Sequence, residues 1–174
     1  MLSNVLSAAT VSRSLALERY WSRGAILWGH TGPVRFQLKP EDESVNVLQA
    51  SPGDPDCLAK DLAARLKKRP IRFAFALQPF QNEHLTPIED GTVEWKEEVS
   101  KPVRIATLVI PEQDPEAPEA LAAKTEVDGE AFNPWNAPDE FRPLGNLNRA
   151  RKSVYAASAA HWLKPGKSPL LTKS

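Results

Sequence analysis

An arginine and a tyrosine four residues apart carry the most specific chemistry in this sequence. Arg151 and Tyr155 lie in a segment with a helical pattern, so they share one helix face, and Asn148 joins that face one turn earlier. A guanidinium held against a phenol oxygen favours the phenolate. A phenolate is a hard ligand for ferric iron, including haem iron. The spacing therefore fits a proximal haem site, but it is also common in surface and packing contacts.

Other motifs of ordinary enzyme chemistry are missing from the sequence. The three histidines, His30, His84 and His161, stand at no metal-binding spacing, and the polar surroundings of the first two indicate solvated side chains. There is no glycine-rich phosphate loop and no G-x-S-x-G elbow. The single cysteine, Cys57, excludes a disulfide framework and a cysteine-based zinc site, and it fits a reducing cytoplasm.

The composition narrows the class of protein further. Lys and Arg number 22 and Asp and Glu number 22, a balance that argues against a nucleic-acid-binding surface. No run of 18 apolar residues predicts a membrane span. The 16 prolines predict short strands and long connections rather than a helical bundle. A chain of 174 residues suits one domain.

The elements that would support the Arg–Tyr pair begin with a lead-in over residues 1–31. Its apolar residues recur at loosely helical spacing, which favours an amphipathic helix over a signal or transit peptide: Val5, Ala9, Leu15 and Leu17. Residues 33–40 alternate apolar and polar side chains and predict a strand. Residues 57–68 predict a helix that Asp56 can cap and Pro70 ends.

Three more strands are expected before a long arm. Residues 71–80 give the clearest alternation, and the small residues on one face indicate that something packs closely there, most commonly a helix. Residues 92–97 predict a third strand through Val93 and Trp95. Residues 103–110 are apolar on both faces apart from Arg104 and Thr107, which predicts a strand buried on two sides.

The arm over residues 112–145 leads to the last helix. Residues 112–130 are rich in Pro, Glu and Ala, which fits either a flexible acidic linker or an extended arm with a short helix at 116–124. Residues 132–145 hold three aromatic side chains, so an ordered segment packed on an apolar surface is expected. Residues 146–164 predict a helix capped by Asn146 and followed by Pro165. The order of elements indicates an α+β fold around an antiparallel four-stranded meander.

Four separated segments also resemble one protein family. They are ERYWSRGAILWG, FALQPFQNEHLTPIEDGTVEW, RIATLVIPEQ and FNPWNAPDEFRPLGNLNRARKSVY. In this order they resemble the C-terminal half of catalase-related haem proteins, the compact forms that include catalase-like peroxidases and allene oxide synthase domains. The resemblance implies that residues 32–111 form half of a catalase-type β-barrel with an inserted helix, that 112–145 form the arm, and that 146–174 hold the proximal haem helix and tail.

The resemblance also implies roles for single residues. Tyr155 matches the proximal ligand of haem b iron, and Arg151 matches the arginine that hydrogen-bonds its phenolate. Phe132 and Pro134 match the segment that lies near the haem, while Asn136 stands where compact forms often have histidine. The implied catalytic residues are Arg151 and Tyr155, and the implied haem-binding residues are Phe132, Pro134, Asn148, Arg151 and Tyr155.

The family's distal histidine and its first four barrel strands have no counterpart in the sequence, so a partner is expected. Four strands leave unpaired edges, which a second copy of the chain or a separate N-terminal half could cover. The implied function is peroxide decomposition or peroxidase chemistry on hydrogen peroxide or organic peroxides, as in the response to oxidative stress, incomplete without that half. The alternative is a non-enzymatic scaffold, or a truncated fragment, that no longer binds haem.

Overall fold

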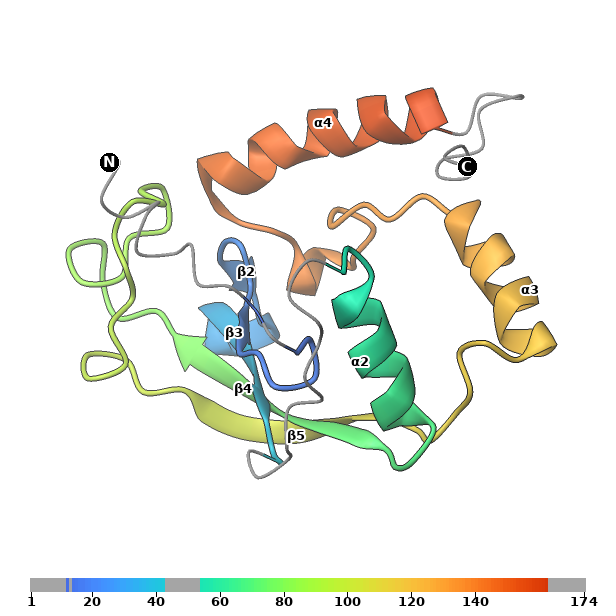
Figure 1. Ribbon diagram of the computed structural model, residues 1–174. Coiled ribbons are helices and arrows are strands. Elements are labelled where there is room, and N and C mark those ends of the chain that lie inside the picture. Colours follow the sequence, from blue (N-terminus) through green and yellow to red (C-terminus); the bar gives the residue numbers. More distant parts are fainter. Residues whose placement is uncertain (1–11, 13, 43–53, 163–174) are drawn as a thin grey trace.

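The computed structural model describes residue 12 and residues 14–42 and 54–162. Figure 1 shows a twisted antiparallel sheet with helices around it. The strands are β1 (Tyr20–Trp21), β2 (Ile26–Leu27), β3 (Pro33–Pro40), β4 (Ile71–Pro79) and β5 (Val103–Ile110). The α-helices are α2 (Cys57–Leu66), α3 (Pro118–Asp128) and α4 (Gly145–Trp162), and short 3-10 turns cover Gly29–Thr31 and Asp139–Phe141.

The sheet confirms the expected α+β class. Its order is β1-β3-β4-β5, and β2 also pairs with β3, so each long strand lies antiparallel to the next. The predicted strands at 33–40, 71–80 and 103–110 are all present. A register shift between Phe75 and Ala76 bends the pairing of β4 with β5. The sheet is open, with β5 at one edge.

The strand that completes the sheet beside β3 is not the one predicted from the sequence. Residues 92–97 form turns and irregular backbone, so the strand expected there is wrong. The strands β1 and β2 occupy the outer position instead, as two short pieces paired with the two ends of β3. Between the two pieces, the Ser22 amide donates to the Phe36 carbonyl at 2.8 Å, while its hydroxyl accepts from the Phe36 amide and donates to the Gly24 carbonyl.

Residues 92–97, which do not form the expected strand, cover one face of β4. The Trp95 side chain is buried, and its indole N–H donates to the Pro87 carbonyl at 3.0 Å. The Gln78 amide, 1% exposed, donates to the carbonyls of Trp95 and Ser100 at 2.7 and 2.9 Å. The close packing expected against this face of β4 is therefore supplied here by a loop rather than by a helix.

Strand β5 is exposed on both faces, which contradicts the expected two-sided burial. Val103 is 58% exposed and Ile105 is 47% exposed, and Leu108 and Val109 exceed 40%. The sequence pattern is that of a strand with neighbours on both faces. Within the described residues no segment covers them, so this strand presents an apolar edge.

Helix α2 packs on the sheet and forms the main apolar cluster. Leu66 lies against Ala16, Ile71 and Phe73, and Leu38, Leu62 and Ile110 border the cluster. Figure 1 shows α2 lying across this part of the sheet. Asp56 occupies the position before the helix, but its side chain makes no capping bond. Its own amide instead donates to the Asp54 carboxylate, which also pairs with Lys60.

The arm and the last helix follow their predictions in part. The helix expected at 116–124 appears as α3 over Pro118–Asp128, which favours the second of the two interpretations of this segment. Helix α4 begins one residue before Asn146, whose amide is bonded by Glu89, so the expected Asn146 cap is replaced by a carboxylate from another segment. Most of the helix expected near the N-terminus lies outside the described residues; within its described end, residues 15–17 form a turn.

Candidate functional site

The predicted site residues lie on the least exposed stripe of helix α4. Asn148 is buried, and Arg151, Tyr155 and Ala159 are half-buried, while the residues between them are exposed. These positions are three or four residues apart, so they share one face of the helix. The structure therefore brings Asn148, Arg151 and Tyr155 together, as their spacing indicated.

The arginine and the tyrosine are in direct contact. The Arg151 Nη2 donates a hydrogen bond to the Tyr155 hydroxyl at 2.8 Å. The guanidinium carbon also lies 5.0 Å from the centroid of the tyrosine ring. Its other terminal nitrogen, Nη1, donates to the Asn148 Oδ1 at 3.1 Å. The guanidinium is thus held at both ends, with one end directed at the phenol oxygen.

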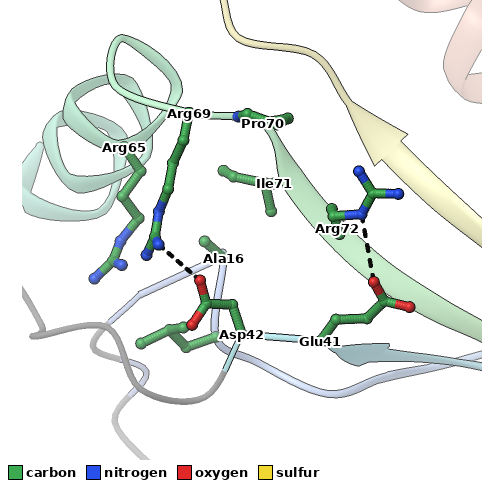
Figure 2. Close-up of a pocket in the computed structure, with 9 residues that line it drawn as sticks. Ala16, Glu41, Asp42, Arg65, Arg69, Pro70, Ile71 and Arg72 are labelled. Carbon is green, nitrogen blue, oxygen red and sulfur yellow. Dashed lines mark ion pairs between the residues drawn. The ribbon is translucent and has the colours of Figure 1, made fainter.

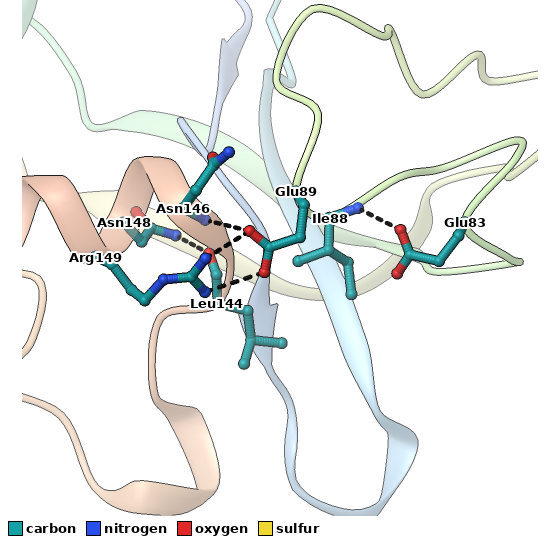
Figure 3. Close-up of polar contacts among 7 residues, drawn as sticks. All are labelled: Glu83, Ile88, Glu89, Leu144, Asn146, Asn148 and Arg149. Carbon is teal, nitrogen blue, oxygen red and sulfur yellow. Dashed lines mark hydrogen bonds and ion pairs between the residues drawn. The ribbon is translucent and has the colours of Figure 1, made fainter.

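The start of α4 is fixed by the connection between β4 and β5. Figure 3 shows the Glu89 carboxylate receiving both terminal nitrogens of Arg149, at 3.0 and 2.7 Å, and the Asn146 amide at 2.8 Å. The Arg149 guanidinium and the Asn146 amide hold the pKa of Glu89 below its usual range, and the carboxylate in turn raises the pKa of Arg149. An anion at the N-terminus of a helix also interacts favourably with the helix dipole.

The arm segment that the resemblance placed near haem lies beside α4. The Trp135 indole donates to the Asn148 carbonyl at 2.7 Å, and the Lys152 ammonium lies 4.8 Å from its ring centroid. Pro134 is half-buried in the same segment. Phe132 is 68% exposed, so the expected apolar packing of this segment does not extend to that ring.

The donor chemistry of the Arg151–Tyr155 pair fits haem iron. A porphyrin supplies its own nitrogen ligands, so one anionic oxygen from the protein suffices to hold the iron. The Tyr155 side chain carries a phenol oxygen, and Arg151 donates a hydrogen bond to it. Neither residue lines any of three cavities described in the structure. Within residues 14–42 and 54–162, no group of three or more His, Cys, Asp or Glu side chains could hold a metal ion.

A charged cavity of about 310 Å³ lies at the end of α2, and no motif in the sequence predicts it. Figure 2 shows Arg65, Arg69 and Arg72 on its wall, opposite Glu41 and Asp42. Arg69 pairs with Asp42 at 2.8 Å, and Arg72 pairs with Glu41 at 3.5 Å. Arg65 and the Ser14 hydroxyl both donate to one oxygen of Asp61. Of these pairs, Arg69–Asp42 connects the turn after α2 to the end of β3, whereas Arg72–Glu41 links β4 to the end of β3 and Arg65–Asp61 lies within α2. The charged groups of this cavity therefore take part in ion pairs, which is a structural role.

Solved structures with a similar fold are catalases. Catalase A from Saccharomyces cerevisiae is similar over 90% of this chain, with a TM-score of 0.68 and 15% sequence identity. A fungal catalase matches with a TM-score of 0.62 over 90% of the chain, and a bacterial catalase with 0.61 over 93%. The chain covers 33–34% of those proteins. The chain therefore has the fold of part of a catalase.

One curated relative agrees with this fold. The catalase-related peroxidase of Mycolicibacterium paratuberculosis (strain ATCC BAA-968 / K-10) is 29% identical over 162 residues, which is 87% of this chain and 47% of the relative. The chain thus spans about half the length of the curated relative that it matches. No protein-family model matches the sequence. The predicted resemblance to catalase-related proteins is confirmed, as is its restriction to a part of their length.

The sequence reasoning missed the side chains that fix the site from outside α4. Glu89 belongs to one of the segments that carry the family resemblance, but its pairing with Arg149 spans 60 residues of sequence and has no local pattern. The contacts of Asn148 with the backbone carbonyls of Ala25 and Leu144 could not be read from its position on the helix face, and its role as a haem-binding residue stays a prediction. No helix in the described ranges is long and apolar enough to cross a membrane.

Proposed function

We propose that this chain binds haem b through Tyr155 as the proximal ligand of ferric iron, with Arg151 favouring the phenolate. The observation that carries the proposal is the 2.8 Å bond from Arg151 Nη2 to the Tyr155 hydroxyl on the half-buried stripe of α4. The similarity to a catalase-related peroxidase supports it, because haem iron is held by tyrosine in catalase. Phe132 and Pro134 would border the cofactor from the arm.

When bound, the haem would supply the redox chemistry for cleaving the O–O bond of hydrogen peroxide or an organic peroxide. That reaction also needs a base that moves a proton between the two peroxide oxygens. None of the three histidines stands in the family's distal motif. We therefore expect the chain alone to bind haem and to show little or no peroxide turnover.

The partner in this proposal is a polypeptide that completes the barrel around the haem. It would be a separate N-terminal half or a second copy of this chain. The support for it is the apolar edge strand β5, which is exposed on both faces. A peroxide-active complex would need that partner to provide the distal base as well as the missing strands.

The test uses the two tyrosines of the chain as a matched pair. Tyr20 lies on β1, 37% exposed, and donates to the Leu15 carbonyl at 2.6 Å. Titration with hemin should give the charge-transfer bands of tyrosinate-ligated ferric haem in the wild type and in Tyr20→Phe. Those bands should be absent in Tyr155→Phe. Bands that survive the removal of Tyr155 would assign the ligand elsewhere.

A second candidate function is a non-enzymatic scaffold that has lost the cofactor. It is favoured by the exposure of Phe132, because this ring is one of the side chains expected to border the haem. If the chain is such a scaffold, we expect it to bind no hemin and to form an oligomer in which β5 is covered. Haem quantification combined with size-exclusion chromatography separates it from the first candidate.

A further inference from the structure

Asn148 links the sheet to the Arg151–Tyr155 pair. Resting on the function proposed above, we propose that Asn148 is a positioning residue that aims the Arg151 guanidinium at the Tyr155 oxygen, rather than a residue that touches haem. The link runs from the Ala25 carbonyl, beside β2, through the Asn148 amide and the Arg151 guanidinium to the Tyr155 hydroxyl.

The hydrogen bonds of Asn148 fix the direction of its side chain. The Nδ2 donates to the Ala25 carbonyl at 2.9 Å and to the Leu144 carbonyl at 2.8 Å, so both amide hydrogens are used. Figure 3 shows the bond to Leu144 at the start of α4. Since two backbone groups set the nitrogen end, the oxygen end must point the other way, where it accepts from Arg151.

The surroundings leave the Asn148 amide little room to turn. Its residue is 2% exposed. A Cβ atom placed on Gly24 would lie 2.7 Å from the Nδ2, so the backbone at residue 24 closes over the amide. The Trp135 indole donates to the backbone carbonyl of Asn148 at 2.7 Å, which anchors the main chain that carries the amide. The acceptor offered to Arg151 therefore has one fixed position.

The bond to Asn148 restricts the conformation of the Arg151 side chain. A long side chain on a half-exposed helix face has many rotamers, and ordering it costs conformational entropy. The bond from Nη1 to Asn148 selects one of these rotamers, and Nη2 then lies 2.8 Å from the Tyr155 hydroxyl. Without the amide oxygen, the guanidinium would leave this position for part of the time.

Substitution of Asn148 would lower the stability of the protein even if the residue had only a structural role. The test must therefore measure the order of the Arg151 side chain. In the apo protein, NMR of the guanidinium protons reports whether Arg151 is held; Arg151→Lys assigns the signal. We expect slowed exchange in the wild type and in Asn146→Ala, the matched control on the exposed face of α4. Exchange should be fast in Asn148→Ala.

Gly24→Ala provides the second variant, because it displaces the Asn148 amide without removing a polar atom. It should give the same fast exchange at Arg151. If Asn148→Ala does not fold, Gly24→Ala carries the test alone. A folded Asn148→Ala or Gly24→Ala protein with undisturbed slow exchange would overturn the proposal.

Hemin binding supplies the second measurement. We expect the affinity for hemin to fall about 10- to 100-fold in Asn148→Ala, as for other residues that orient a metal ligand, with tyrosinate ligation retained in the bound fraction. An affinity equal to that of Asn146→Ala would contradict the inference. A wild-type protein that binds no hemin would refute the proposed function, whereas the NMR experiment would still decide the role of Asn148.

Discussion

Gln78 shows how a single side chain decides where a segment of the chain lies. Its amide is 1% exposed and donates to the carbonyls of Trp95 and Ser100. These two bonds hold residues 95–100 as a loop across β4. The alternation of Val93 and Trp95 predicted a strand here, and that prediction is wrong. A short alternating pattern does not reveal that a buried side-chain amide from another strand will bond to the backbone of the segment.

We expect Gln78→Leu to destabilise the protein by on the order of 2 kcal/mol, because two buried carbonyls lose their donor. The free energy of unfolding from urea denaturation measures this change. Gln113→Leu is the matched control, since Gln113 is exposed, and it should stay within about 0.5 kcal/mol of the wild type. Equal effects of the two substitutions would contradict the role given to Gln78.

The Arg151–Tyr155 contact is the part of the site that spacing alone could predict. Residues four apart on a helix must share a face, and the observed bond follows from this geometry. The contacts of Asn148 with Ala25 could not be predicted in the same way, because they join positions 123 residues apart.

At the scale of elements, the position of α4 depends on a glycine at its start. Gly145 has a φ of +84°, and a Cβ there would lie 2.5 Å from the Ile88 carbonyl oxygen. The backbone of α4 therefore touches the β4–β5 connection directly. Glu89, the next residue after Ile88, then reaches Asn146 and Arg149.

Gly145→Ala should destabilise the protein by more than about 1 kcal/mol, because it adds backbone strain and a clash with Ile88. Gly91→Ala is the control, since nothing lies within 4 Å of a Cβ at that position and its φ is ordinary. Thermal unfolding followed by circular dichroism compares the two. A Gly145→Ala protein as stable as Gly91→Ala would show that α4 does not depend on this close contact.

The pairing of Glu89 with Arg149 should make the docking of α4 dependent on pH. Because the folded-state pKa of Glu89 is lowered, the pair stabilises the protein above the usual glutamate pKa, and this contribution is lost as the pH falls through the lowered value. The melting temperature of Glu89→Gln should therefore lie below that of the wild type at neutral pH and approach it in acid. Added salt should also reduce the difference, since both side chains are more than half exposed. A difference that is constant with pH would exclude this contribution.

The three long strands and α2 could be predicted because each has a regular pattern of its own. β1 and β2 could not, because they are two residues each and exist only through pairing with β3. Short paired segments of this kind leave no periodic pattern in a sequence.

At the scale of the molecule, the exposed strand β5 is the main consequence of having part of a catalase fold. Its sequence predicts burial on two faces, and the described chain leaves both faces open. The length of 174 residues suits a domain, yet the chain covers about a third of the catalases that it resembles. The pattern predicted the strand itself, but the burial expected on its two faces is not found, because no segment within the described residues covers them.

We expect the purified chain to associate in a concentration-dependent way through β5. Ile105→Lys should shift the protein toward the monomer, since a charge on an edge strand opposes pairing. Val154→Lys makes a similar change on the exposed part of α4 and should have no such effect. Sedimentation velocity over a range of concentrations measures the association. A wild-type chain that stays monomeric at high concentration would contradict an interacting β5 edge.

Resonance Raman spectroscopy of the hemin-loaded chain tests the central claim most directly, because it detects the vibrations of an iron-bound phenolate. The chain has only two tyrosines, so labelling with ring-deuterated tyrosine changes few signals. We expect tyrosinate bands that shift with the label in the wild type and in Tyr20→Phe, and no such bands in Tyr155→Phe. Tyrosinate bands in Tyr155→Phe, or hemin bound to the wild type without them, would contradict ligation by Tyr155.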